Sequence, residues 1–179
     1  MKHHRQTIRA AIATQLKGKT DAGDRVFVNR QRTLRRDDLP CLLVYTTTES
    51  CDTGYAEQTA PRQDKRRLTC VVDIRAESRN GLDDLLDRLA FQVEQAVFAD
   101  VSFGQTVADG FLNSTNIQFS EEGEHCIGAC ELSFELHYYT DASPNPDSWP
   151  YWNSAGVTIN TGSGESTEQS INLPGSDQP

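Results

Sequence analysis

KRRLTCVVDIRAE, residues 65–77, alternates cleanly between two sets of side chains. Successive side chains of a β-strand point to opposite faces, so this alternation predicts a strand with one buried face. The face predicted to be buried carries Leu68, Cys70, Val72, Ile74 and Ala76. The opposite face is predicted to carry Thr69, Val71, Asp73, Arg75 and Glu77.

The segments on either side of this strand predict a second strand and a long helix. CLLVYTTTE, residues 41–49, is an apolar run that ends in threonines, which is typical of a central strand buried on both faces. After the strand, Asn80 is predicted to be the N-cap of a helix that ends near Ala99. One stripe of that helix is apolar: Leu82, Leu85, Leu86, Leu89, Val93, Ala96 and Val97.

The remaining elements complete an α+β pattern. Residues 4–18 have the spacing of a first helix with Gly18 as its stop, and a short strand is predicted over 25–29. Residues 113–120 and 125–139 predict a hairpin. The expected order is α-β-β-β-α-β-β, a mostly antiparallel sheet packed against two helices.

The composition changes near residue 141, which predicts a domain over 1–140 and an irregular arm over 141–179. The arm holds 5 of the 7 prolines and both tryptophans. Two short alternating segments within it, 157–159 and 170–173, are consistent with a small hairpin, which is marginal in water by itself. We interpret the aromatic cluster as an anchor on a partner, with packing on the chain's own core as the alternative; its members are Trp149, Tyr151 and Trp152.

Charge is divided unevenly along the chain, and this division favours assembly. All 17 basic residues lie in 1–88 with 13 acidic ones, giving +4, whereas residues 89–179 hold 13 acidic residues and no basic ones, giving −13. Opposite net charges on the two halves of the chain favour contacts between copies, because the positive half of one copy attracts the negative half of another. The predicted docking surface consists of basic residues in two clusters, Arg30, Arg32, Arg35 and Arg36, then Arg62, Arg66 and Arg67. The alternatives are a solvated loop with a protected strand edge, or a nucleic-acid-binding module that uses these basic residues.

The sequence contains no positive sign of an enzyme. None of the common phosphate-loop, nucleophile-elbow or zinc-protease motifs occurs. Cys126 and Cys130 lie four apart on a predicted strand, roughly 13 Å, which is too far to share one zinc. A His–Cys pair with His137 as the base lacks a third orienting group. We therefore expect no catalytic residue, no metal and no cofactor, and we expect neither a secretion signal nor a membrane span.

The order of these motifs resembles the tail terminator (minor tail protein U-like) family of long-tailed bacteriophages. The resemblance covers about residues 4–140 and depends on the segments quoted above, together with an opening helix HHRQTIRAAIATQL and a closing strand CELSFELHYYT. The Leu-Pro before a Val-Tyr-Thr strand and the terminal Tyr-Thr carry most of it. The arm from 141 onward lies outside the resemblance.

The resemblance implies a structural role in the virion. Such proteins are taken to form a hexameric ring that caps the head-proximal end of the tail tube and stops its polymerisation. The expected partners are further copies of the chain, the tail tube protein and the head connector or neck protein, with DNA passing through the lumen without specific binding. Assembly would take place in the host cytoplasm. A head–tail neck adaptor is the closest alternative.

Overall fold

The computed structural model divides the chain into two compact units, Met1–Ala142 and Ser143–Pro179. The structure describes residues 3–28, 34–52, 63–122, 125–141, 154–160 and 166–172. In the second unit, β6 (Ser154–Asn160) and β7 (Ser166–Asn172) pair antiparallel as a two-stranded sheet. The two alternating segments noted in the sequence, 157–159 and 170–173, overlap these strands.

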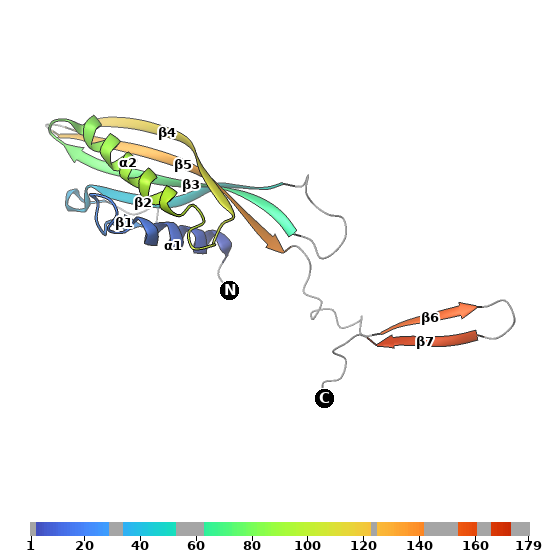
Figure 1. Ribbon diagram of the computed structural model, residues 1–179. Coiled ribbons are helices and arrows are strands. Elements are labelled where there is room, and N and C mark those ends of the chain that lie inside the picture. Colours follow the sequence, from blue (N-terminus) through green and yellow to red (C-terminus); the bar gives the residue numbers. More distant parts are fainter. Residues whose placement is uncertain are drawn as a thin grey trace. The chain divides into compact units, whose positions relative to one another are not determined.

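The first unit is built on one five-stranded sheet with the order β1-β2-β3-β5-β4 (Figure 1). Its strands are β1 (Val26–Phe27), β2 (Cys41–Asp52), β3 (Gln63–Ser78), β4 (Asp109–Glu122) and β5 (His125–Asp141). Only β1 and β2 run parallel; every other neighbouring pair is antiparallel. The α+β prediction and its order of elements are confirmed.

Two helices cover one face of this sheet. The helix α1 (His4–Leu16) lies over β1 and β2, and α2 (Leu82–Ala99) lies over β3 and β5. Gly128 of β5 allows α2 to approach closely, because a Cβ at this position would lie 2.7 Å from Cδ1 of Leu86. Glycine is the residue that permits such close packing of helix on strand.

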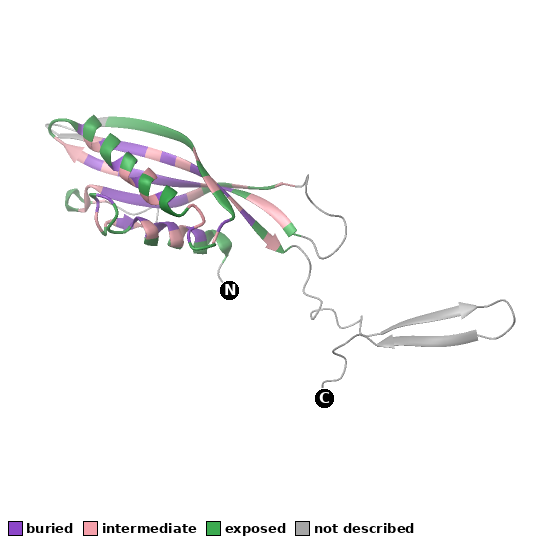
Figure 2. Ribbon diagram, in the orientation of Figure 1, coloured by how far each residue is buried: buried purple, intermediate pink, exposed green. Residues whose placement is uncertain are grey.

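The core lies between the helices and the sheet. Figure 2 shows the buried residues along the central strands. The five side chains of the 65–77 strand that were predicted to face inward are all fully buried in β3. The buried side chains of β5 alternate in the same way: Cys130, Leu132, Phe134, Leu136 and Tyr138. Alternation therefore predicted correctly which face of β3 packs against the helices.

The N-cap prediction for α2 was wrong. The cap is Gly81, with φ +66° in the left-handed region, and the first intrahelical bond joins Leu85 N–H to the Gly81 carbonyl at 3.2 Å. Only glycine adopts this conformation readily, so it replaces the side-chain cap expected from Asn80. The Asn80 carbonyl instead accepts a hydrogen bond from the Ser78 hydroxyl at 2.7 Å.

Candidate subunit interface

The structure separates the described basic residues into two sites. Arg35 and Arg36 border a single 3-10 turn (η1, Arg36–Asp38), and Arg36 Nε lies 3.4 Å from Glu77 Oε2 near the end of β3. Arg66 and Arg67 lie near the start of the same strand. Glu77 lies eleven positions after Arg66, a distance of about 36 Å along an extended strand. The two clusters do not form one continuous surface.

Six other residues of the predicted interface lie outside the described part of the chain. They are Arg30, Arg32, Arg62, Trp149, Tyr151 and Trp152. Their role in a partner contact stays a prediction.

Arg66 belongs to a polar cluster around Glu49, at the end of the sheet next to the start of α1. Its Nη1 atom lies 3.8 Å from Glu49 Oε2, and Arg5 Nη1 lies 3.7 Å from the same oxygen. The Tyr138 hydroxyl donates to the other carboxylate oxygen of Glu49. Burial, followed by this hydrogen bond, raises the pKa of Tyr138 above its ordinary value. Arg66 therefore stabilises the fold as well as contributing charge to the surface.

Arg67 points to the other face of the sheet, as the alternation of β3 requires. It is exposed, and its register partner on β5 is His137. Of the four described residues of the predicted interface, Arg35 and Arg67 have no side-chain ion pair assigned to them in the structure, whereas Arg36 and Arg66 pair with glutamates.

The segment that contains Arg35 covers part of the helix-free face of the sheet. Leu34 and Phe27 pack there against Leu43, Tyr45 and Val71. Beside them lies a cavity of about 510 Å³ with Arg35 and Arg36 at its rim. Because this segment covers the sheet, the second face is partly buried, and the sequence did not indicate this.

Asp73 shows most clearly that the helix-free face of the sheet is partly buried. Alternation placed its side chain on the outer face, yet it is 2% exposed. Its Oδ2 atom accepts hydrogen bonds from Arg75 Nε at 3.0 Å and Nη2 at 2.7 Å. Burial lowers the pKa of Arg75, but the bond to Asp73 raises it, and the net change is upward. Asp73 and Arg75 therefore form an ion pair in the lining of the cavity.

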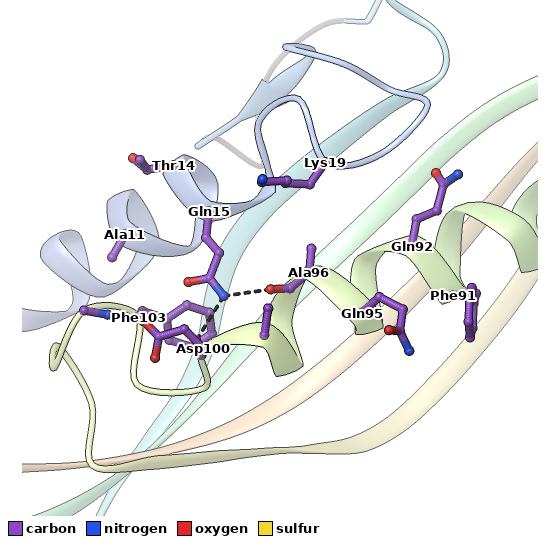
Figure 3. A pocket seen from close by; sticks show the side chains of 12 residues that line it. Ala11, Thr14, Gln15, Lys19, Phe91, Gln92, Gln95, Ala96, Asp100 and Phe103 are labelled. Atoms are coloured by element: carbon purple, nitrogen blue, oxygen red, sulfur yellow. Dashed lines mark hydrogen bonds between the residues drawn. The ribbon is translucent and has the colours of Figure 1, made fainter.

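A second, larger groove lies between the two helices (Figure 3). It has a volume of about 750 Å³ and is lined largely by small, aromatic and amide side chains. Gln15 crosses from α1 to the end of α2, where its Nε2 atom donates to the carbonyls of Ala96 at 2.8 Å and Asp100 at 3.0 Å. These bonds satisfy carbonyls left without partners at a helix end. The lining suits apolar contact rather than acid–base chemistry.

The described residues do not assemble the nucleophile pair that was weighed in the sequence. His137 hydrogen-bonds to Glu135 at 2.9 Å on the helix-free face. Cys70 and Cys130 are buried in the core on the opposite face of the sheet. Across the described ranges, no group of three His, Cys, Asp or Glu side chains is placed to hold a metal ion. None of the described helices is long and apolar enough to cross a membrane.

Comparison with known proteins finds similarity among solved structures. No protein-family model matches the chain, and no curated protein matches it. Among solved structures, a chain from the "Virion of native gene transfer agent (GTA) particle" is similar, with 11% sequence identity and a TM-score of 0.40. The match covers 74% of this chain and 95% of that one. A similarity at this level does not bear on function.

Proposed function

We propose that this chain is a structural virion protein, a tail terminator that assembles as a ring on the head-proximal end of a phage tail tube. The observation that carries the proposal is the order of elements, α-β-β-β-α-β-β with both helices on one face of the sheet. The same order of elements is the basis of the resemblance to the tail terminator family. The ring would stop further addition of tube subunits and provide the surface to which the head joins.

The distribution of charge supports assembly into a ring. A closed ring is held by a heterologous interface, in which one patch of a subunit meets a different patch of its neighbour. The helix α1 contains no acidic residue, whereas α2 contains four and a single arginine. Arg88, that single arginine, is already paired with Asp21 at 2.9 Å. The chain therefore has two differently charged surfaces of the kind that such an interface uses.

Nucleic-acid binding has less support than assembly. Arg36 and Arg66 are each next to a glutamate, which reduces the positive charge available to phosphates. The two basic clusters are also far apart along β3, so they do not form one continuous groove. Retention on duplex DNA at about 50 mM salt, lost at higher salt, would reverse this preference.

The location of the protein in the particle tests the proposal. We would attach an epitope tag to the amino terminus and label purified tails, detached heads and whole particles with gold-conjugated antibody. A terminator is expected at one end of detached tails and at the head–tail junction of whole particles. Label on detached heads with bare tails would identify a neck adaptor. Label on neither would contradict a role in the tail.

A further inference from the structure

The strand β4 is a long, open edge of the sheet. It is the last strand in the sheet order and pairs only with β5 among the described strands. From Asn113 to Phe119 every side chain is exposed, and the strand contains no lysine, arginine or proline. Charged residues, prolines and bulges are the usual means of blocking an edge strand. In β4 the charged residues, Asp109, Glu121 and Glu122, lie only at the two ends, and a bulge lies between Leu112 and Ser114. The segment 114–119 contains none of these features.

The helix-side face of β4 adjoins an acidic and apolar flank of α2. Ile117 and Phe119 are register partners of Cys130 and Gly128, which lie on the helix side of β5, yet they are 43% and 53% exposed. Phe98 of α2 is 47% exposed and contacts the Phe134 ring of β5 edge-on, with centroids 6.4 Å apart.

Acidic side chains of α2 lie along the same flank. Asp87 and Glu94 are seven residues apart on α2, and Glu94 is four residues before Phe98, so the three side chains lie on one side of the helix. We call the surface formed by Asp87, Glu94, Phe98, Ile117 and Phe119 the β4 flank.

The opposite edge of the sheet is open too, and its helix is basic. On its outer side β2 pairs with β1 only at Leu42 and Leu43, so among the described strands nothing continues the sheet beyond them. Arg9 lies on α1, and Lys17 is the C-cap residue that follows the helix. Arg9 Nη1 donates to Thr46 of β2 at 2.8 Å, which shows that the side of α1 that carries Arg9 faces β2. We call Arg9, Lys17 and the β1–β2 edge the α1 flank.

Resting on the ring proposed above, we propose that the β4 flank of one copy binds the α1 flank of the next copy, which continues both the sheet and the helical layer around the ring. Acidic side chains of α2 would face basic ones of α1, which favours this pairing over contact between two like flanks. Because β4 runs opposite to β1 and β2, a neighbour in the same orientation adds an antiparallel strand.

The register of the sheet indicates which residues would meet. One cross-strand row joins Val26, Leu42, Ile74, Cys130 and Ile117 across all five strands. In a continued sheet, Ile117 of one copy is level with Val26 of the next, close to Val28, which is 43% exposed. Another row joins Ser50, Arg67, His137 and Asp109. Asp109 of one copy is then level with Ser50 and the exposed Cys51 of the next.

A matched pair of variants of the full chain tests the surface. Ile117→Lys places a cation on the β4 flank, and Thr14→Lys places one on the α1 side of the groove between the helices, away from both flanks. We expect Ile117→Lys to raise the concentration needed for assembly by about tenfold or more, because a lysine would face the cationic α1 flank, and Thr14→Lys to assemble as wild type. Mass photometry measures assembly, and circular dichroism checks folding. Normal assembly of Ile117→Lys contradicts the proposal.

Cross-linking tests the head-to-tail arrangement independently. A chain carrying Asp109→Cys and Cys51→Ser is mixed with a differently tagged wild-type chain and treated with a short bismaleimide. We expect a product between the two chains and none between copies of the double variant, with Cys51→Ser alone as the negative control. A product between copies of the double variant would indicate a symmetric β4–β4 contact. If the wild-type chain assembles and neither product forms, the proposed contact between the β4 flank and the α1 flank is wrong, but the proposed ring is not contradicted. A wild-type chain that stays monomeric contradicts the ring itself.

Discussion

Glu49 shows how one residue can hold an element in place at the edge of the core. Its carboxylate is the common partner of Arg5 from α1, Arg66 from β3 and Tyr138 from β5. The His4 ring also stacks on the Tyr138 ring, with centroids 5.7 Å apart. The first turn of α1 is therefore attached to the sheet by polar contacts, which complement the apolar packing of Ile8 and Ile12 further along the helix.

Removing this carboxylate should destabilise the domain. Glu49→Ala leaves two guanidinium groups and the Tyr138 hydroxyl without their shared acceptor, and we expect a loss of about 1–3 kcal/mol in the free energy of unfolding. Urea denaturation would measure it. Asp21→Ala, which removes an exposed ion pair with Arg88, is the control and should cost at most about 1 kcal/mol. Equal losses in the two variants would show that the Glu49 cluster has no special role.

At the scale of elements, the sequence predicted the buried face most accurately in long segments whose apolar side chains recur at one regular spacing. The five inward residues of β3 and the apolar stripe of α2 follow directly from periods of 2 and 3.6. The Gly81 cap was missed because nothing in Asn80-Gly81 distinguishes a left-handed glycine from a side-chain cap. The burial of Asp73 was missed because it depends on residues 34–40, a loop segment whose packing has no sequence period.

The central strands contain three buried cysteine thiols, and these predict how the free energy of unfolding depends on pH. Burial is the main cause that raises the pKa of Cys41 and Cys130 from 9.0 to about 11, and that of Cys70 to about 12. A folded-state pKa above the unfolded value gives stability that is full below pH 9 and is lost as pH rises through the folded values. We therefore expect the free energy of unfolding to fall between about pH 9 and 11.

Cys130→Ala tests this expectation. The variant loses one raised thiol, so its free energy of unfolding should fall less steeply with pH than that of wild type, even though the smaller side chain lowers stability at pH 7. Urea titrations at pH 7, 9, 10 and 11 give the two slopes. Parallel slopes would show that the Cys130 thiol does not ionise on unfolding in this range.

At the scale of the whole molecule, the candidate interface could be predicted only in part. Sequence charge identified two basic clusters, but their separation along β3 and the pairing of Arg36 and Arg66 with glutamates depend on the fold. The β4 flank was not predicted, because Ile117 and Phe119 have the pattern of ordinary core residues. Their exposure follows from the position of β4 at the sheet edge, beyond the cover of α2.

The segment around η1 is predicted to contact a neighbouring subunit or ring. Arg35→Glu with Arg36→Glu should block assembly while the domain still folds, because the two changes reverse the charge at the rim of the cavity. Lys19→Glu, a charge reversal on the groove between the helices, should assemble normally. Mass photometry compares the variants. Assembly of the double variant at wild-type concentrations would show that the segment is only a solvated surface.

The arm is predicted to contribute to assembly rather than to the stability of the first unit. Deleting residues 142–179 should leave the melting temperature of the monomer unchanged and weaken assembly. Both tryptophans of the chain, Trp149 and Trp152, are in this arm, so a shift of tryptophan emission on assembly of the intact chain would report directly on the arm. A lower melting temperature in the truncated monomer would mean that the arm packs on its own core.

The most direct test of the tail terminator proposal is the length of tails made when the gene is disrupted. Electron microscopy of particles from such cells, with a complemented strain beside them, measures the tail length and the fraction joined to heads. We predict overlong tails without heads, because nothing would stop addition of tube subunits, and normal particles on complementation. Tails of normal length beside unjoined heads would contradict a terminator and identify a neck adaptor instead.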